Sequence, residues 1–165
     1  MPRLPLLLLP PLLLLLLALA ACGFQLRQDI ALPPAYERIQ LETVDPFSAL
    51  GQDLGNALVR AGATLVEGER SAVLRISADH VTSAPLTVGE SGRVQEYALR
   101  HRVEVELLGP DGSVAMPRQI VELSRDYTFD SSEALGSPGE EEVVREELRR
   151  EMVQAILRRL QAAVR

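Results

Sequence analysis

The only cysteine of the chain, Cys22, constrains the fold more than any other residue. With one cysteine no disulfide can form within the chain, so the packing of apolar side chains has to stabilise the fold. The residues before Cys22 are unlike a globular sequence. Residues 1–21 carry one charge, at Arg3, and leucine runs at 6–9 and 12–17 flank Pro10 and Pro11 before a small-residue end. The globular fold must therefore be built from residues after 21.

A positive start, an apolar middle and a small-residue end are typical of a secretory signal peptide. The apolar part is shorter than the ~20 residues of a membrane span, and prolines interrupt it. The sequence Leu19-Ala20-Ala21-Cys22 resembles the lipobox of bacterial lipoproteins. In those lipoproteins the cysteine thiol is joined to diacylglycerol, and cleavage before the cysteine frees its amine for a third acyl chain. Two or more acyl chains give a stable membrane anchor. We expect removal of residues 1–21 and lipidation of Cys22. An ordinary signal peptide followed by a chance cysteine is the alternative.

The remaining chain, residues 22–165, is long enough for one domain with its own core. Residues 22–35 are predicted to form a lipidated N-terminal tether, and residues 36–165 a single globular domain. Removal of Arg3 changes the formal net charge from −6 to −7, and this acidic balance argues against nucleic-acid binding. His80 and His101 are the only histidines, and without a free cysteine they make a poor zinc site.

The first half of the domain predicts a strand followed by a helix. Apolar residues alternate with polar ones over 39–43, which indicates a strand with one buried face. Asp45 and Pro46 suit the N-cap and first position of a helix, and Gly62 suits its C-cap. Gly51 and Gly55 would weaken this helix by ~1 kcal/mol each relative to alanine, and they would allow close approach to the sheet. The predicted apolar stripe comprises Phe47, Leu50, Leu54, Leu58 and Ala61.

The second half predicts three strands and a closing helix. Alternation over 74–78, 97–107 and 121–129 indicates strands, and the turn at 109–112 joins the last two as a hairpin. Residues 140–142 are glutamates that favour a helix start, and the helix stripe comprises Val144, Leu148, Met152, Ala155, Ile156 and Leu160. We therefore predict an α/β (α+β) two-layer sandwich. A mostly antiparallel sheet of about four strands carries two helices on one face, in the order β-α-β-β-β-α.

No catalytic or metal-binding constellation is evident. The chain contains no nucleophile-elbow, Walker A or dinucleotide-binding glycine motif. Asp79 and His80 are adjacent, and adjacent strand side chains point to opposite faces, which makes them a weak dyad. Both histidines are expected to be structural or exposed. The sequence predicts no enzyme, no metal and no cofactor apart from the covalent lipid on Cys22.

The stretch 85–92 is predicted to be a loop between two long strands. It contains Leu86 and Val88, which have no role in a helix or strand stripe, and Arg93 follows it. One interpretation is a solvated hairpin tip, and the other is a contact loop on a rigid scaffold. Leu86, Val88 and Arg93 are therefore candidate contacts for a partner or a ligand. For the nearby Arg102 we favour pairing with a glutamate of the sheet.

Three segments together resemble one family. Residues 22–27 read Cys-Gly-Phe-Gln-Leu-Arg, which is similar to the Cys-Gly-aromatic-x-Leu-Arg opening of the LptE lipopolysaccharide-assembly lipoproteins. Residues 92–97 match the family's Gly-x-x-x-Glu-Tyr, and residues 124–130 read Ser-Arg-Asp-Tyr-Thr-Phe-Asp before Ala134-Leu135, an acidic loop and the last helix. The resemblance spans the chain from Cys22 to its C-terminus, and the family fold, a two-layer α/β sandwich, agrees with the element order above.

The resemblance implies a non-catalytic lipoprotein of the outer-membrane lipopolysaccharide translocon. Such a protein plugs and helps to assemble an LptD-like β-barrel, takes part in inserting lipopolysaccharide into the outer leaflet, and is anchored on the periplasmic side with its domain inside the barrel lumen. Gly23 after the lipidated cysteine is compatible with transfer to the outer membrane. In better-known members of the family, basic residues near the loop before Glu-Tyr and in the loop before the last helix are linked to lipopolysaccharide binding. At the corresponding places this chain has Glu90-Ser91 and Gly136-Ser137. The rivals are a generic outer-membrane lipoprotein acting as a periplasmic ligand-binding module and, less favoured, a tethered hydrolase.

Overall fold

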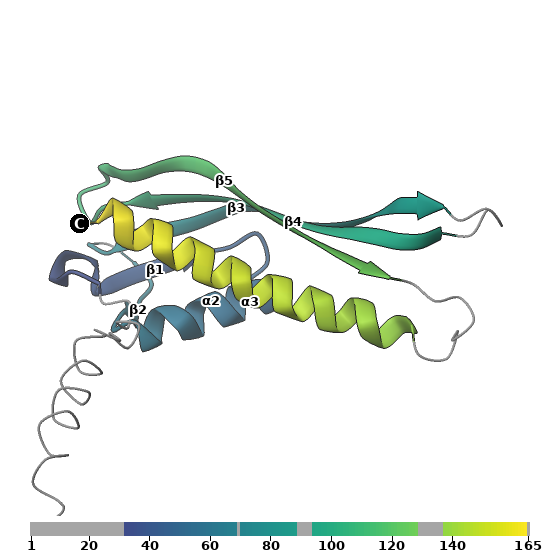
Figure 1. Ribbon diagram of the computed structural model, residues 1–165. Helices are drawn as coiled ribbons and strands as arrows, with labels where there is room; N and C mark the ends of the chain where they lie inside the picture. Colours follow the sequence, from purple (N-terminus) through teal and green to yellow (C-terminus); the bar gives the residue numbers. More distant parts are fainter. Residues whose placement is uncertain (1–31, 69, 89–93, 129–136, 165) are drawn as a thin grey trace, which may run out of the picture.

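The computed structural model describes residues 32–164 except residues 69, 89–93 and 129–136 (Figure 1). The predictions for the signal peptide, for Cys22 and most of its tether, and for Arg93 therefore lie outside the described residues. So do those for Gly23, Phe129, Glu90-Ser91 and Gly136.

One sheet and two helices make up the domain. The elements are η1 (Pro34–Tyr36), β1 (Arg38–Glu42), α2 (Ala49–Arg60), β2 (Thr64–Leu65), β3 (Ala72–Val88), β4 (Val94–Leu108), β5 (Val114–Thr128) and α3 (Ser137–Ala163). The strand order is β2-β1-β3-β4-β5. β1 runs parallel to β2 and β3, while β3, β4 and β5 form an antiparallel meander. The predicted fold class is confirmed, with five strands rather than about four because of the two-residue β2.

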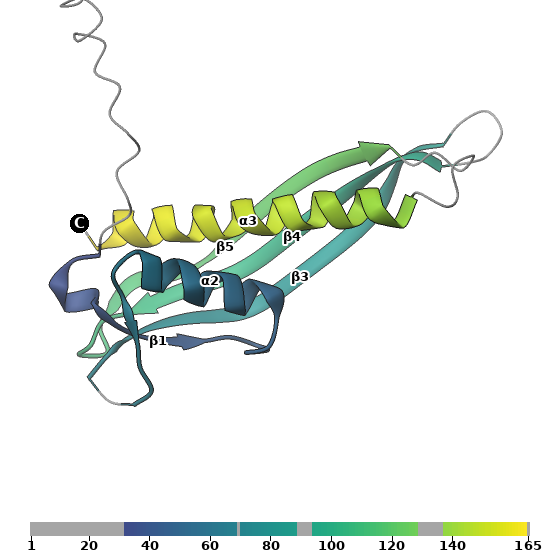
Figure 2. The ribbon, with the colours of Figure 1, turned by 90° about the horizontal axis from the view of Figure 1, so that it is seen from below.

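The two helices pack on the same face of the sheet (Figure 2). α2 lies over the end of the sheet that holds β1 and β2, whereas α3 runs along the length of the long strands. β3, β4 and β5 extend well beyond α2, and α3 covers the sheet at the far end. Both helices that the structure describes leave the opposite face of the sheet uncovered.

The core lies between this helical layer and the inward side chains of the strands. The alternation predicted for β4 is confirmed, since Leu99, His101, Val103, Val105 and Leu107 are buried. The main cluster also takes in Leu54 and Leu58 of α2. A smaller cluster, built on Leu99, Tyr127 and Leu148, lies farther along α3. The predicted α3 stripe is also confirmed; its buried members are Leu148, Met152, Ala155, Ile156 and Leu160.

The predicted start of α2 is wrong. The helix begins at Ala49, and its N-cap is Ser48, whose Oγ accepts a hydrogen bond from the Gly51 N–H at 3.0 Å. Asp45 caps a turn instead, because its Oδ1 accepts from the Phe47 N–H at 2.8 Å. This turn points Phe47 outward, and its side chain is 83% exposed rather than part of the apolar stripe.

Gly62 has the predicted role at the end of α2, and α2 lies close to the sheet at Gly55. Gly62 follows the C-cap residue Ala61 with φ +92°, a left-handed conformation that glycine adopts without strain. A Cβ on Gly55 would lie 3.4 Å from Leu65 Cδ1 and 3.7 Å from Leu41 Cδ2. These are ordinary van der Waals distances, so α2 lies close to β1 and β2 at residue 55, and an added Cβ would still fit there.

The loop predicted from residue 85 is also wrong over its first four residues. β3 continues to Val88, with Pro85 opposite Tyr97 and Thr87 opposite Glu96. β1 pairs only with residues 72–75 of β3, so in the described part of the chain the rest of β3 is an edge strand. Proline is tolerated on an edge because its missing N–H breaks no ladder hydrogen bond.

Candidate functional site

The predicted contact residues that the structure describes lie at the far end of the sheet. Leu86 is 54% exposed in β3, and Val88 is the last residue of that strand. Next to them, Thr87 Oγ1 donates to Glu96 Oε2 at 2.6 Å, which ties β3 to β4. Leu86 and Val88 therefore belong to a paired strand end rather than to a free loop.

The histidines do not form a catalytic centre. Asp79 Oδ1 lies 2.8 Å from Nε2 of His101 on the neighbouring strand, whereas His80 is exposed. His101 is buried, so this contact satisfies its ring inside the core. Within the described ranges no cluster of three or more histidine, cysteine, aspartate or glutamate residues could hold a metal ion.

A polar contact ties the first half of α3 to the sheet. Tyr127 OH donates to Glu141 Oε2 at 2.9 Å and lies 3.2 Å from Ser83 Oγ, and its ring stacks on Tyr97 with centroids 5.5 Å apart. Burial is the main cause that raises the pKa of Tyr127 above its usual 10.0. Sequence reasoning assigned Tyr127 to an apolar face, because alternation shows only that a side chain points inward.

Ion pairs hold α3 along its length. Arg125 of β5 pairs with Glu151 and, at 4.0 Å, with Glu147. Arg149 Nε donates to Asp53 Oδ2 of α2 at 2.7 Å. Tyr127 and Arg125 thus reach α3 from β5, and Asp53 reaches it from α2. The position of α3 over the sheet is therefore specified by polar contacts as well as by apolar packing.

The uncovered sheet face carries paired charges. Arg75 contacts Glu42 at 2.6 Å and Glu106 at 2.7 Å, and the hydrogen bond to Glu42 is the largest cause that raises the pKa of Arg75. Arg100 pairs with Glu122 across to β5 at 3.5 Å.

Arg102 lies 3.4 Å from Glu104 on its own strand, so the expected glutamate pairing is present, though along the strand. The face therefore carries charges of both signs, beside the exposed Ile120 opposite Glu104, and its charged part suits contact with water or with another polar surface.

Neither of the helices that the structure describes has an apolar stretch long enough to cross a membrane.

The comparisons with known proteins point to one family. The family model described as LptE, lipopolysaccharide-assembly, matches residues 36–160. The protein named LPS-assembly lipoprotein LptE from Photorhabdus laumondii is 27% identical over 149 residues, which are 89% of this chain and 81% of the relative. The protein of the same name from Yersinia enterocolitica is 29% identical over 150 residues, which are 89% of this chain and 72% of the relative.

Solved structures agree with this family. The chain is similar to the solution structure of an uncharacterized lipoprotein B from Nitrosomonas europaea, with a TM-score of 0.72 and 30% identity over 85% of this chain and 91% of the other. It is also similar to the crystal structure of the rare lipoprotein B from Shewanella oneidensis, with a TM-score of 0.68 and 25% identity. This match covers 76% of this chain and 94% of the other.

Proposed function

This chain belongs to the LptE lipopolysaccharide-assembly family, and from that membership we propose that it is a non-catalytic lipoprotein subunit of the outer-membrane lipopolysaccharide translocon. The observation that carries the proposal is the family match over residues 36–160, which takes in every helix and strand of the domain from β1 to most of α3.

We infer a two-part attachment to the outer membrane. Residues 1–21 would be removed as a signal peptide, Cys22 would carry the lipid, and the domain from residue 36 would dock inside an LptD-like β-barrel. Support for the docked position comes from the uncovered sheet face, where Arg75, Arg100 and Arg102 are paired with glutamates. The interiors of outer-membrane barrels are polar, so a surface of paired charges can lie against such a wall without burying apolar groups there.

Recovery of the barrel tests the partner. The tagged mature protein, extracted from outer membranes in a neutral detergent, should bring down one large β-barrel protein in comparable amount. Recovery of no such protein would sink the proposal.

A charge reversal, Arg100→Glu, tests the docking face because it places like charges opposite Glu122 and presents repulsion to the partner. The matched control is Arg158→Glu, an equally exposed arginine on α3. The face assignment requires that the first variant, and not the second, lowers barrel recovery.

Mass spectrometry of the purified mature protein tests the anchor. The expected mass is that of residues 22–165 plus three acyl chains and a glycerol linkage. Cys22→Ser should abolish lipidation. An unmodified cysteine in the membrane-bound wild-type protein would refute the anchor without bearing on the barrel.

A further inference from the structure

The helix α3 is anchored unevenly along its length. Residues 152–160, the anchored segment, pack into the main cluster through Met152, Val153, Ala155, Ile156, Leu157 and Leu160, which are all buried. Over residues 139–151, in contrast, Leu148 is the only buried residue, and Val143 is 56% exposed. The leading segment of α3, residues 139–148, is therefore held to the sheet by far less apolar packing than the anchored segment.

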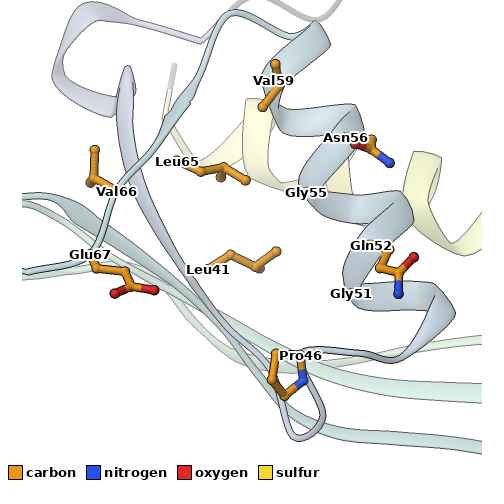
Figure 3. A pocket seen from close by; sticks show the side chains of 10 residues that line it. All are labelled: Leu41, Pro46, Gly51, Gln52, Gly55, Asn56, Val59, Leu65, Val66 and Glu67. Carbon is orange, nitrogen blue, oxygen red and sulfur yellow. The ribbon is translucent and has the colours of Figure 1, made fainter.

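The helix α2 supports the near end of the sheet but not the smaller cluster. At the groove between α2 and the β1–β2 edge, Leu41 and Leu65 point from the strands toward α2 near Gly55 (Figure 3). Leu54 and Leu58 of α2 belong to the main cluster. Among the described residues, the smaller cluster consists of side chains from β3, β4, β5 and α3. The leading segment thus packs on the sheet without help from α2.

The smaller cluster is thin. Its buried residues are Leu99, Tyr127 and Leu148, and the partly buried side chains around them are Val81, Tyr97, Leu123 and Val144. The leading segment contributes two of these side chains, Val144 and Leu148. Segments held by few buried apolar contacts open at a smaller free-energy cost than the core of a domain. We therefore expect the leading segment to separate from the sheet before the anchored segment does.

The polar contact that closes the leading segment has second partners that remain after separation. Glu141 Oε2 accepts a hydrogen bond from Tyr127 OH at 2.9 Å, while Glu141 Oε1 accepts from Arg145 of its own helix at 2.5 Å. Tyr127 OH also lies 3.2 Å from Ser83 Oγ of β3. Breaking the Tyr127–Glu141 bond, the latch, leaves both groups with a partner, so the cost of an unsatisfied buried group is avoided.

A clamp marks the boundary between the leading and anchored segments. Arg149 Nε donates to Asp53 Oδ2 of α2 at 2.7 Å, and Arg125 of β5 pairs with Glu151. Arg125 also lies 4.0 Å from Glu147, and it keeps Glu151 when Glu147 moves away. These contacts hold α3 at residues 149–151, so movement of the leading segment need not reach the anchored segment.

The leading segment keeps its helix when it leaves the sheet. Arg145 pairs with Glu141 and, at 3.9 Å, with Glu142, and pairs at this spacing support a helix without tertiary contacts. Residues 140–163 contain no glycine or proline that would break the helix. A segment that continues an anchored helix also needs no new nucleation.

We propose that the leading segment of α3 is a lid, which opens from the far end of the sheet while the anchored segment stays in place. Opening exposes Leu99 and the stacked rings of Tyr97 and Tyr127, whose centroids are 5.5 Å apart. The far end of the domain therefore presents an apolar, aromatic surface in the open state and covers it in the closed state. The lid goes beyond the proposed function, since it depends on neither the barrel nor a lipid.

Thiol labelling of the mature protein measures the opening, because a buried cysteine reacts only when its surroundings open. Leu148→Cys reports on the lid and Leu160→Cys on the anchored segment, and both replace a buried leucine of α3. The exposed Val143→Cys gives the rate of an unprotected thiol. Peptide mass spectrometry locates each label, so Cys22 does not interfere. We expect Leu148→Cys to react at least about tenfold faster than Leu160→Cys and at least about tenfold slower than Val143→Cys.

Low urea and two further substitutions separate lid opening from global unfolding. Urea below the unfolding transition should hardly change the labelling of Leu148→Cys, because the lid exposes little surface, and should speed that of Leu160→Cys. Tyr127→Phe removes the latch and should speed the labelling of Leu148→Cys about fivefold. The matched control is Ile39→Val, a change of similar size in the main cluster, which should speed the labelling of Leu160→Cys and leave that of Leu148→Cys unchanged.

Three results would overturn the lid. Equal rates for Leu148→Cys and Leu160→Cys would mean that α3 opens only when the whole domain unfolds. Labelling of Leu148→Cys at the rate of Val143→Cys would mean that the leading segment never closes, and no effect of Tyr127→Phe would mean that the helix end frays without a latch. Val144→Cys, a smaller change in the same cluster, is a second reporter should Leu148→Cys fail to fold, and Tyr127→Phe should speed its labelling as well.

Discussion

Replacing Gly55 by alanine should stabilise the domain. Gly55 lies inside α2, where glycine costs ~1 kcal/mol relative to alanine. The added Cβ would lie 3.4 Å from Leu65 Cδ1 and 3.7 Å from Leu41 Cδ2, which are ordinary contacts with the ends of leucine side chains. The gain in helix propensity should therefore be kept, at about 1 kcal/mol, which corresponds to an increase of roughly 3–4 °C in the unfolding midpoint.

Two other glycines provide the comparison. Gly51→Ala should be close to neutral, since its Cβ would lie 3.1 Å from Oγ of the N-cap Ser48 and would disturb the cap. Gly62→Ala should cost about 1–2 kcal/mol, because φ there is +92° and no packing could offset the strain.

Urea unfolding of the mature protein, followed by far-ultraviolet circular dichroism, measures all three variants. Destabilisation by Gly55→Ala would refute the reasoning, because it would mean that α2 needs a bare backbone at 55 to reach the sheet.

Three further predictions concern the contacts under α3. Leu148→Ala should lower the free energy of unfolding by about 3 kcal/mol, because this side chain is fully buried in the smaller cluster, whereas the exposed Val143→Ala should change it by less than ~0.5 kcal/mol. Burial raises the pKa of Tyr127, so its contribution to stability is fully present below the usual pKa of 10.0 and is lost as the pH rises from that value through the raised pKa of the folded state. Urea midpoints at about pH 9 and about pH 11 should therefore fall less for Tyr127→Phe than for wild type. Asp79→Ala should cost about 1–3 kcal/mol in the same assay, because it leaves the buried His101 without its partner; an unchanged midpoint would contradict this.

The inward faces could be predicted from the sequence because they depend on spacing alone. The alternation in β4 and the helical stripe of α3 both mark the buried side of their element, and both were confirmed. The turn at 109–112 could be predicted for the same local reason, since Gly112 adopts φ +80° there. β2 has two residues, which is too short for any periodic signal.

Features that depend on competition or on distant pairing could not be predicted. Asp45 and Ser48 are both good caps, and the choice between them follows from the turn that Asp45 closes on Phe47. Pro85 is a strand residue only because β1 ends early and leaves β3 as an edge.

The candidate sites show the same limit. The partnership of Asp79 with His101 depends on the register of β3 against β4, which includes a shift between Ile76 and Ala78. Leu86 and Val88 stay candidate contacts, and the assignments of Cys22 and Arg93 stay predictions.

The place of α3 after all five strands affects how the protein is made. The chain is synthesised from its N-terminus, so the strands emerge before the helix that covers them. Until α3 emerges, Leu99, Val103 and Val105 have no cover along much of the sheet, and the nascent chain exposes an aggregation-prone surface. A chain truncated before Leu148 would keep all five strands and still lack a closed core. We expect such fragments to depend on holding chaperones and to be degraded, whereas removal of the residues before η1 should leave folding unaffected.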